Sequence, residues 1–174
     1  MLEEIKKYFF QKKLKSDIQS NRSKRLLKDF ADMTDIGIAF DGTEYEMITT
    51  VRDLERKFKQ EGKNVSLYVY LNSNDDKKQP YLITNKNLNW FGYPTKNHLF
   101  EFANKEFDLL FGFFNEHESP LNAIFANSKS KLRIGVNYNQ DYELFDIIVE
   151  SDKIKNTEDI ITSLTQFITR VKTK

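Results

Sequence analysis

The chain has 174 residues, of which 39% are hydrophobic, and its 15 Phe, 8 Tyr and one Trp supply the large apolar side chains of one sizeable core. It contains no cysteine, which excludes disulfide scaffolds, thiol catalysis and thiolate metal sites. The net charge of +1 conceals an asymmetry, because residues 1–28 hold nine basic and three acidic residues, a balance of +6, whereas the remaining residues hold 18 basic and 23 acidic, a balance of −5.

The N-terminal segment predicts a basic helix. Two sets of apolar residues recur there at three- and four-residue steps: Leu2, Ile5 and Phe9, followed by Phe10, Leu14 and Ile18. We expect this helix to run from residue 2 to about residue 30, with a break near Ser20 and Asn21. Residues 1–32 are therefore predicted to form a basic helical arm, and residues 33–174 a single α/β, Rossmann-like domain.

Strands and helices alternate after the arm. Residues 36–40 are a short apolar run, typical of a buried parallel strand. Thr43 and Glu46 form a capping box that begins a helix, and Gly62 supplies the left-handed residue that ends it. Residues 65–71 are dense in Val, Tyr and Leu and predict a second strand.

The middle of the chain continues this alternation. Residues 72–79 are polar and predict a surface loop, and residues 81–84 predict a short third strand. A helix is expected over residues 95–106. Residues 109–114 contain no polar side chain, as a central strand covered on both faces requires, and we expect this strand to lie beside the first.

The C-terminal third predicts two helices and a pair of strands. Ser119 and Pro120 are a cap residue and a first helical residue, and Thr157 caps a final helix. Residues 132–137 and 145–150 predict the strands. The connection between them is too short for a parallel crossover, so this pair is expected to form an antiparallel hairpin at one edge of the sheet.

This order of elements indicates an α/β fold. We expect a doubly wound, mostly parallel sheet of about five to six strands with helices on both faces. The last pair of strands is the antiparallel edge hairpin, and the basic N-terminal helix precedes the sheet.

The sequence carries no recognised catalytic or cofactor motif. Its six glycines form neither a dinucleotide-binding pattern nor a phosphate-cradling loop, and His98 and His117 lie in no metal-ligand spacing. No apolar run approaches the roughly 20 residues that a membrane-spanning helix needs. We therefore expect a cytoplasmic protein and assign it no catalytic residue, metal ligand or cofactor.

One candidate ligand site is the crevice at the carboxyl ends of the first strand and the 109–114 strand, where doubly wound sheets bind ligands. Asp41 and Thr43 follow one strand, and Glu116 and His117 follow the other. Asp41 could bind a cation or a sugar hydroxyl, and His117 could act as a general base. The alternative is that the first pair forms a turn and the second a solvated loop.

A second candidate is the aromatic turn at residues 88–94, which contains Trp90, Phe91 and Tyr93. Exposed aromatic loops anchor protein partners or stack on nucleic-acid bases. Alternatively, these rings fold back to cover the open end of the sheet, because exposed clusters of this size are uncommon in monomers.

The third candidate is the basic arm itself. Its nine basic residues are Lys6, Lys7, Lys12, Lys13, Lys15, Arg22, Lys24, Arg25 and Lys28. Such a stripe neutralises RNA phosphates, or lies on an anionic membrane with Tyr8, Phe9 and Phe10 inserted. The alternative is a solvated helix face whose apolar side packs on the acidic body.

Two resemblances add to these patterns. With its basic start and the motifs I-G-I-A-F-D, L-N-W-F-G-Y-P, F-D-L-L-F-G and K-L-R-I-G-V, the whole chain resembles a family of short bacterial proteins known only as a domain of unknown function. The F-D-L of residues 107–109 and the later R-I-G of residues 133–135 are similar to part of the N-terminal half of heptosyltransferase-type glycosyltransferases. The second resemblance implies a fold and no catalytic residue.

Taken together, these features favour a non-catalytic protein that binds a macromolecular partner through its basic N-terminal helix. RNA or a nucleoprotein is the preferred anionic partner, ahead of a membrane surface. A small-molecule binder or enzyme that uses the crevice for a nucleotide or sugar derivative is the alternative. A homo-oligomer formed through the edge hairpin of residues 132–150 is a third possibility.

Overall fold

A parallel sheet organises the fold, which is described here from a computed structural model. The described residues are 1–21, 28–43, 45–75, 81–114, 119–136, 143–149, 159, 163 and 166. Within these ranges, six strands form one sheet in the order β3-β2-β1-β4-β5-β6, and each adjacent pair is parallel. The strands are β1 (Asp35–Asp41), β2 (Asn64–Leu71), β3 (Leu82–Thr84), β4 (Leu109–Phe113), β5 (Arg133–Val136) and β6 (Ile147–Val149).

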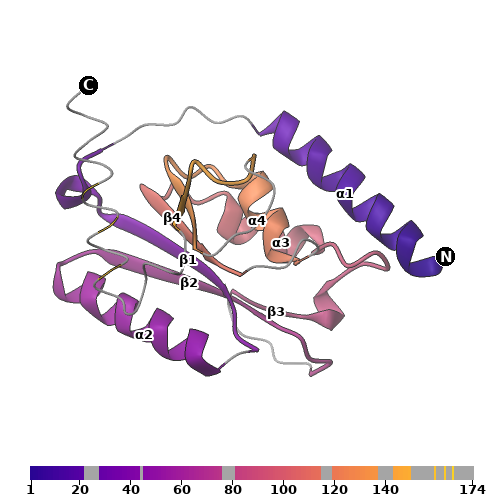
Figure 1. The fold of residues 1–174 in the computed structure, drawn as a ribbon, viewed down its shortest axis with the longest axis horizontal. Coiled ribbons are helices and arrows are strands. Elements are labelled where there is room, and N and C mark those ends of the chain that lie inside the picture. The colour runs from indigo at the N-terminus through magenta and orange to yellow at the C-terminus, as the bar shows by residue number, and fades with distance from the viewer. Residues whose placement is uncertain are drawn as a thin grey trace.

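Helices cover both faces of this sheet, as the sequence predicts. They are α1 (Leu2–Ser20), α2 (Tyr45–Gln60), α3 (Lys96–Ala103) and α4 (Leu121–Asn127), with short 3-10 helices η1 (Phe30–Asp32) and η2 (Asn85–Asn87). Helix α2 lies on one face, whereas α1, α3 and α4 lie on the other (Figure 1). Strands β1 and β4 are neighbours at the centre, which confirms the predicted pairing and places the reversal of strand order between them.

The predicted antiparallel hairpin is wrong, because β5 and β6 run parallel. The prediction assumed strands over residues 132–137 and 145–150, which leave too few residues for a crossover. In the structure β5 ends at Val136 and β6 begins only at Ile147, so the connection is longer. A homo-oligomer built on an edge hairpin therefore loses its structural basis.

The connection between β5 and β6 is anchored by buried side chains just before β6. Leu144 and Phe145 precede β6 and are both buried on the face that α4 covers. The next residue, Asp146, fixes the register: its amide donates to the carbonyl of Arg133 at 2.9 Å, and its carboxylate accepts from the amide of Arg133 at 2.7 Å. The sequence therefore closes this parallel crossover with two buried apolar residues and one aspartate.

The predicted basic arm begins with helix α1, which ends at Ser20. The break near Ser20 is confirmed, because α1 ends there and the side chain of Asn21 donates to the carbonyl of Asp17 at 3.0 Å. The predicted end near residue 30 is wrong, since Lys28 and Asp29 are not helical and the 3-10 helix η1 comes next. Residues 22–27 lie outside the described residues.

The end of α2 and the start of α4 lie close to the residues that the sequence predicts for them. Gly62 has a φ of +78°, which confirms the left-handed residue predicted for the end of α2. Its amide donates to the carbonyl of Lys59 and the next amide donates to that of Phe58, which is a Schellman arrangement. At the start of α4, the Ser119 hydroxyl accepts from the Leu121 amide at 3.3 Å. The side chain of Glu46, expected in a capping box, lies outside the described residues.

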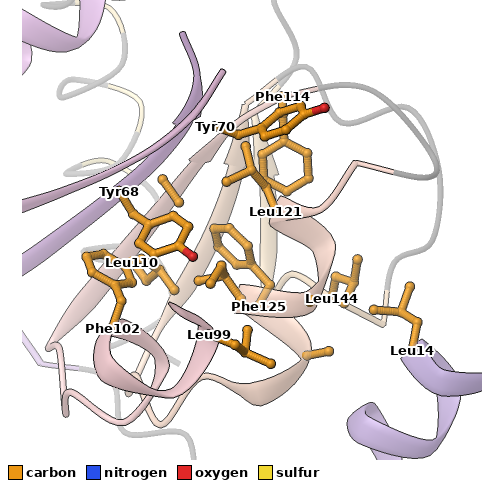
Figure 2. Close-up of a cluster of buried hydrophobic side chains, with 14 of the residues drawn as sticks. Leu14, Tyr68, Tyr70, Leu99, Phe102, Leu110, Phe114, Leu121, Phe125 and Leu144 are labelled. Atoms are coloured by element: carbon orange, nitrogen blue, oxygen red, sulfur yellow. The ribbon is translucent and has the colours of Figure 1, made fainter. Parts of the chain in front are cut away.

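Phenylalanine dominates the core, as the composition predicts. Figure 2 shows the cluster on the face covered by α1, α3 and α4, which includes Phe102, Phe114 and Phe125 and, from α1, Leu14. The rings leave no space above the central strand: a Cβ on Gly112 would lie 2.8–2.9 Å from ring carbons of its neighbours. This close approach explains the glycine within β4.

A buried carboxylate ties the amino ends of the central strands together. Asp108 is 3% exposed and precedes β4. It accepts hydrogen bonds from the amide of Thr34 at 2.9 Å, from Lys131 at 2.7 Å and from Lys28 at 2.8 Å. Burial alone would raise the pKa of Asp108, but the hydrogen bonds from both lysines and the Thr34 and Asp35 amides hold it well below its usual range.

This depressed pKa predicts a loss of stability in acid. The ionised form of Asp108 stabilises the folded state above the unfolded-state pKa of about 4, and the contribution is lost as the pH falls from there toward the folded-state pKa. We expect Asp108→Asn to lower the free energy of unfolding by about 1–3 kcal/mol near neutral pH. Urea denaturation at a series of pH values should show this deficit shrinking below about pH 4. A deficit that stays constant there would contradict the assignment.

Candidate partner-binding surface on the N-terminal helix

Helix α1 has two apolar faces, of which one is buried and the other is exposed. Phe10 and Leu14 are 1% and 5% exposed, and they join the core beside α4. Leu2, Ile5 and Phe9, the other periodic set, are 63%, 42% and 40% exposed. The helix is therefore docked on the body through one face and presents a second apolar face outwards.

The docked face is locked by a buried polar network around Asp17. The carboxylate of Asp17 accepts hydrogen bonds from the Tyr93 hydroxyl and from Asn127 of α4 at 2.9 Å, and it pairs with Lys13. Burial, helped by the hydrogen bond to Asp17 and its charge, raises the pKa of Tyr93 well above its usual range, so the hydroxyl stays protonated and donates. This network connects α1 to α4 and to the aromatic turn.

The aromatic turn divides between the core and the surface. Tyr93 is 2% exposed, so it is a core residue and not a partner-binding residue of the free surface. Phe91 is half-buried and packs against the core cluster. Trp90 is 58% exposed. Tyr93 thus folds back into the core, as the alternative interpretation expects, whereas a binding role stays a prediction for the exposed Trp90 and the half-buried Phe91.

The structure brings the exposed part of the turn against the exposed face of α1. The ring of Phe9 lies 5.3 Å from that of Trp90 and 6.3 Å from that of Phe91, and 5.6 Å from that of Tyr8. We call these four residues the aromatic patch: Tyr8, Phe9, Trp90 and Phe91. Two features that the sequence identifies separately therefore form one surface.

A groove of about 360 Å³ opens beside the aromatic patch. One wall comes from the first turns of α1 and the other from η2 and the aromatic turn. Its lining residues are Glu3, Lys6, Lys7, Phe10, Asn85, Leu88, Asn89, Trp90, Phe91 and Gly92. The groove thus combines two ammonium groups with side-chain amides and aromatic rings.

The predicted basic residues of the arm separate into three groups. Lys6, Lys7, Lys12, Lys13 and Lys15 all lie on α1. Lys6 pairs with Glu3 at 2.7 Å and Lys12 lies 5.9 Å from the centre of the Tyr8 ring, while Lys13 serves the Asp17 network. Lys28 instead pairs with the buried Asp108 and is structural. Arg22, Lys24 and Arg25 lie outside the described residues.

The crevice candidate is described in part. Asp41 and Thr43 lie at the carboxyl end of β1, next to the reversal of strand order. The carboxylate of Asp41 accepts from the Thr43 amide at 2.9 Å, and the Thr43 hydroxyl accepts from the Asn72 amide at 3.4 Å. Both side chains thus support a turn. Glu116 and His117 lie outside the described residues.

Within the described ranges, no group of three or more His, Asp or Glu residues is placed to hold a metal ion. None of the described helices is long and apolar enough to cross a membrane.

Comparison with known proteins assigns the chain to a family. The model of a family of unknown function, DUF6913, matches residues 6–170. The chain belongs to the DUF6913 family. No curated protein and no solved structure matches it, so the resemblance to heptosyltransferase-type glycosyltransferases finds no support, and neither does a bacterial origin. The range matched by DUF6913 includes the whole sheet and every lining residue of the groove except Glu3.

Proposed function

We propose that this DUF6913 protein is a non-catalytic, cytoplasmic protein that binds RNA, free or within a nucleoprotein, through the outward face of α1. The observation that carries the proposal is that Lys6 and Lys7 at the groove, and Lys12 beside Tyr8, lie next to the aromatic patch. Phosphates of RNA are recognised by ammonium groups and its bases by aromatic rings. This surface offers both within a few ångströms of each other.

The distribution of charge supports the same function. The five lysines of α1 lie on a docked, structured helix, so a partner would meet them in fixed positions. The described part of α1 contains three acidic residues, of which Asp17 is buried. The body of the chain is acidic overall, which directs an anionic partner toward α1.

Salt dependence tests the proposal. For a single-stranded RNA that contacts four to five lysines, log K falls with log salt with a slope of about −0.7 per phosphate. Raising the salt from about 50 to about 200 mM should therefore lower the affinity roughly 50- to 130-fold. Fluorescence anisotropy of a labelled RNA of mixed sequence measures this. No binding at the lower salt, or an affinity that salt does not change, would contradict the proposed function.

A further inference from the structure

We infer that this surface is specific for single-stranded RNA: a base stacks on Trp90 while the adjoining phosphates lie on Lys6 and Lys7 at the groove. This inference rests on the proposed function and adds the class of RNA and the residue that distinguishes it. It follows from the position of Trp90, from the shape and chemistry of the groove, and from the geometry of RNA itself.

Trp90 is held in place but remains available to a ligand. It is 58% exposed although it contacts two rings, Phe9 at 5.3 Å and Phe91 at 5.2 Å. The interplanar angles are 64° and 82°, so neither neighbour stacks in parallel on the indole. Edge-type contacts of this kind position a ring without using up its stacking capacity. A nucleic-acid base can therefore stack in parallel on the indole of Trp90, a position that neither Phe9 nor Phe91 occupies.

The support beneath Trp90 is rigid. The carboxamide oxygen of Asn89 accepts from the amides of Phe91 and Tyr93, at 3.1 and 3.0 Å. Tyr93 is in turn bonded to the buried Asp17 of α1. The turn and the helix thus keep a fixed relation, which is what preorganised stacking on Trp90 requires.

The groove distinguishes RNA from a lipid surface. It is concave, and half of its lining side chains are charged or carry amides: Glu3, Lys6, Lys7, Asn85 and Asn89. A lipid-inserting helix needs an apolar surface that enters the bilayer and not a polar hollow beside it. A nucleotide with a stacked base and a charged phosphate matches this mixture of groups.

The geometry of RNA restricts the ligand to single strands. In an A-form duplex the bases are stacked on one another, and their faces are closed to a protein side chain. Only an unpaired segment, in a loop or at an end, can place a base face on Trp90. The α1 lysines alone would also bind a duplex, so the preference for single strands depends on the aromatic patch.

The test uses the fact that Trp90 is the only tryptophan of the chain. Titrating the full chain with a ten-nucleotide oligouridylate should quench the indole emission as the base stacks. Trp90→Ala should weaken oligouridylate binding roughly 5- to 100-fold while leaving the salt slope unchanged. Phe100→Ala is the matched control, because Phe100 is exposed on α3 and lies outside the patch and the groove, and its affinity should equal that of the native chain.

Each other outcome has a distinct meaning. One outcome is that the oligouridylate binds with the expected salt slope, but its binding does not quench the indole emission and Trp90→Ala does not weaken it. That outcome overturns the inference and leaves the proposed function standing. Equal affinity for a duplex of the same length also overturns the inference. If no RNA binds, but vesicles containing phosphatidylserine shift the emission to the blue, both the inference and the proposed function are overturned in favour of membrane binding.

Discussion

Phe10→Ala is expected to lower the free energy of unfolding by about 3–5 kcal/mol, a large part of the stability of a domain of this size. Phe10 is 1% exposed, and its ring lies 5.4 Å from that of Tyr93. Removing it opens a cavity between α1 and the body and loosens the face that carries the Asp17 network. The measurement is equilibrium denaturation in urea, monitored by the emission of Trp90.

The neighbouring residue provides the control. Phe9→Ala removes a side chain of the same type, but Phe9 is 40% exposed and its ring lies beside those of Tyr8, Trp90 and Phe91. Its loss should cost about 1 kcal/mol or less. If the two substitutions had equal effects, α1 would not be docked in the register described above.

The docking of α1 also determines how its function can be tested. Deleting residues 1–28 would remove the lysines but also Phe10 and Leu14, which belong to the core. Such a deletion would confuse lost binding with lost folding. Substitutions on the outward face avoid this, because the side chains of Lys7, Lys12 and Lys15 are exposed.

Much of the central architecture could be predicted from the sequence, because local patterns carry it. The unbroken apolar runs at residues 36–40 and 109–114 identify strands covered on both faces, and these became the adjacent β1 and β4. Gly62 marked a helix end through its positive φ, and Ser119 marked a helix start through the hydrogen bond that its hydroxyl accepts from the Leu121 amide. These signals depend on neighbours in the chain and not on distant contacts.

The predictions that proved wrong concern features that depend on contacts between residues far apart in the sequence. The direction of β6 depends on two buried residues, Leu144 and Phe145, and on the pairing of Asp146 with Arg133, none of which the length of the connection reveals. Lys28 looked like part of a solvated basic stripe, yet it neutralises Asp108, eighty residues further along the chain. Charge counting along a sequence cannot detect such pairs.

The sequence predicted the parts of the candidate surface separately and not their arrangement. The sequence marked the lysines and the aromatic turn, but it grouped both apolar sets of α1 without saying which one is buried. One signal was available: Asp17 falls at a helical step from Phe10 and Leu14, on the same face, and a lone carboxylate there indicated a polar partner such as Tyr93. Only the fold could place Trp90 beside Phe9.

The largest functional effect is expected from neutralising the outward face of α1. The variant Lys6→Gln, Lys7→Gln, Lys12→Gln and Lys15→Gln removes four positive charges without touching Lys13 of the Asp17 network. If each lysine contacts one phosphate, the salt slope for single-stranded RNA should fall by about 3, and the affinity at about 0.1 M salt should drop roughly 10²- to 10³-fold.

A charge-matched control exists on the opposite face of the sheet. Helix α2 carries four basic residues, and the variant Arg52→Gln, Arg56→Gln, Lys57→Gln and Lys59→Gln changes the net charge by the same amount. Arg56 and Lys59 form ion pairs within their own helix, with Asp53 and Glu55, and such surface pairs contribute little to stability. Both variants should therefore fold like the native chain.

The most direct test of RNA binding through α1 is the affinity of these two variants for the same single-stranded RNA, measured side by side by fluorescence anisotropy at about 0.1 M salt. The account predicts that the α1 variant loses roughly 10²- to 10³-fold in affinity while the α2 variant stays within about 3-fold of the native chain. Equal losses in both variants would mean that only net charge matters, and would contradict a binding surface on α1.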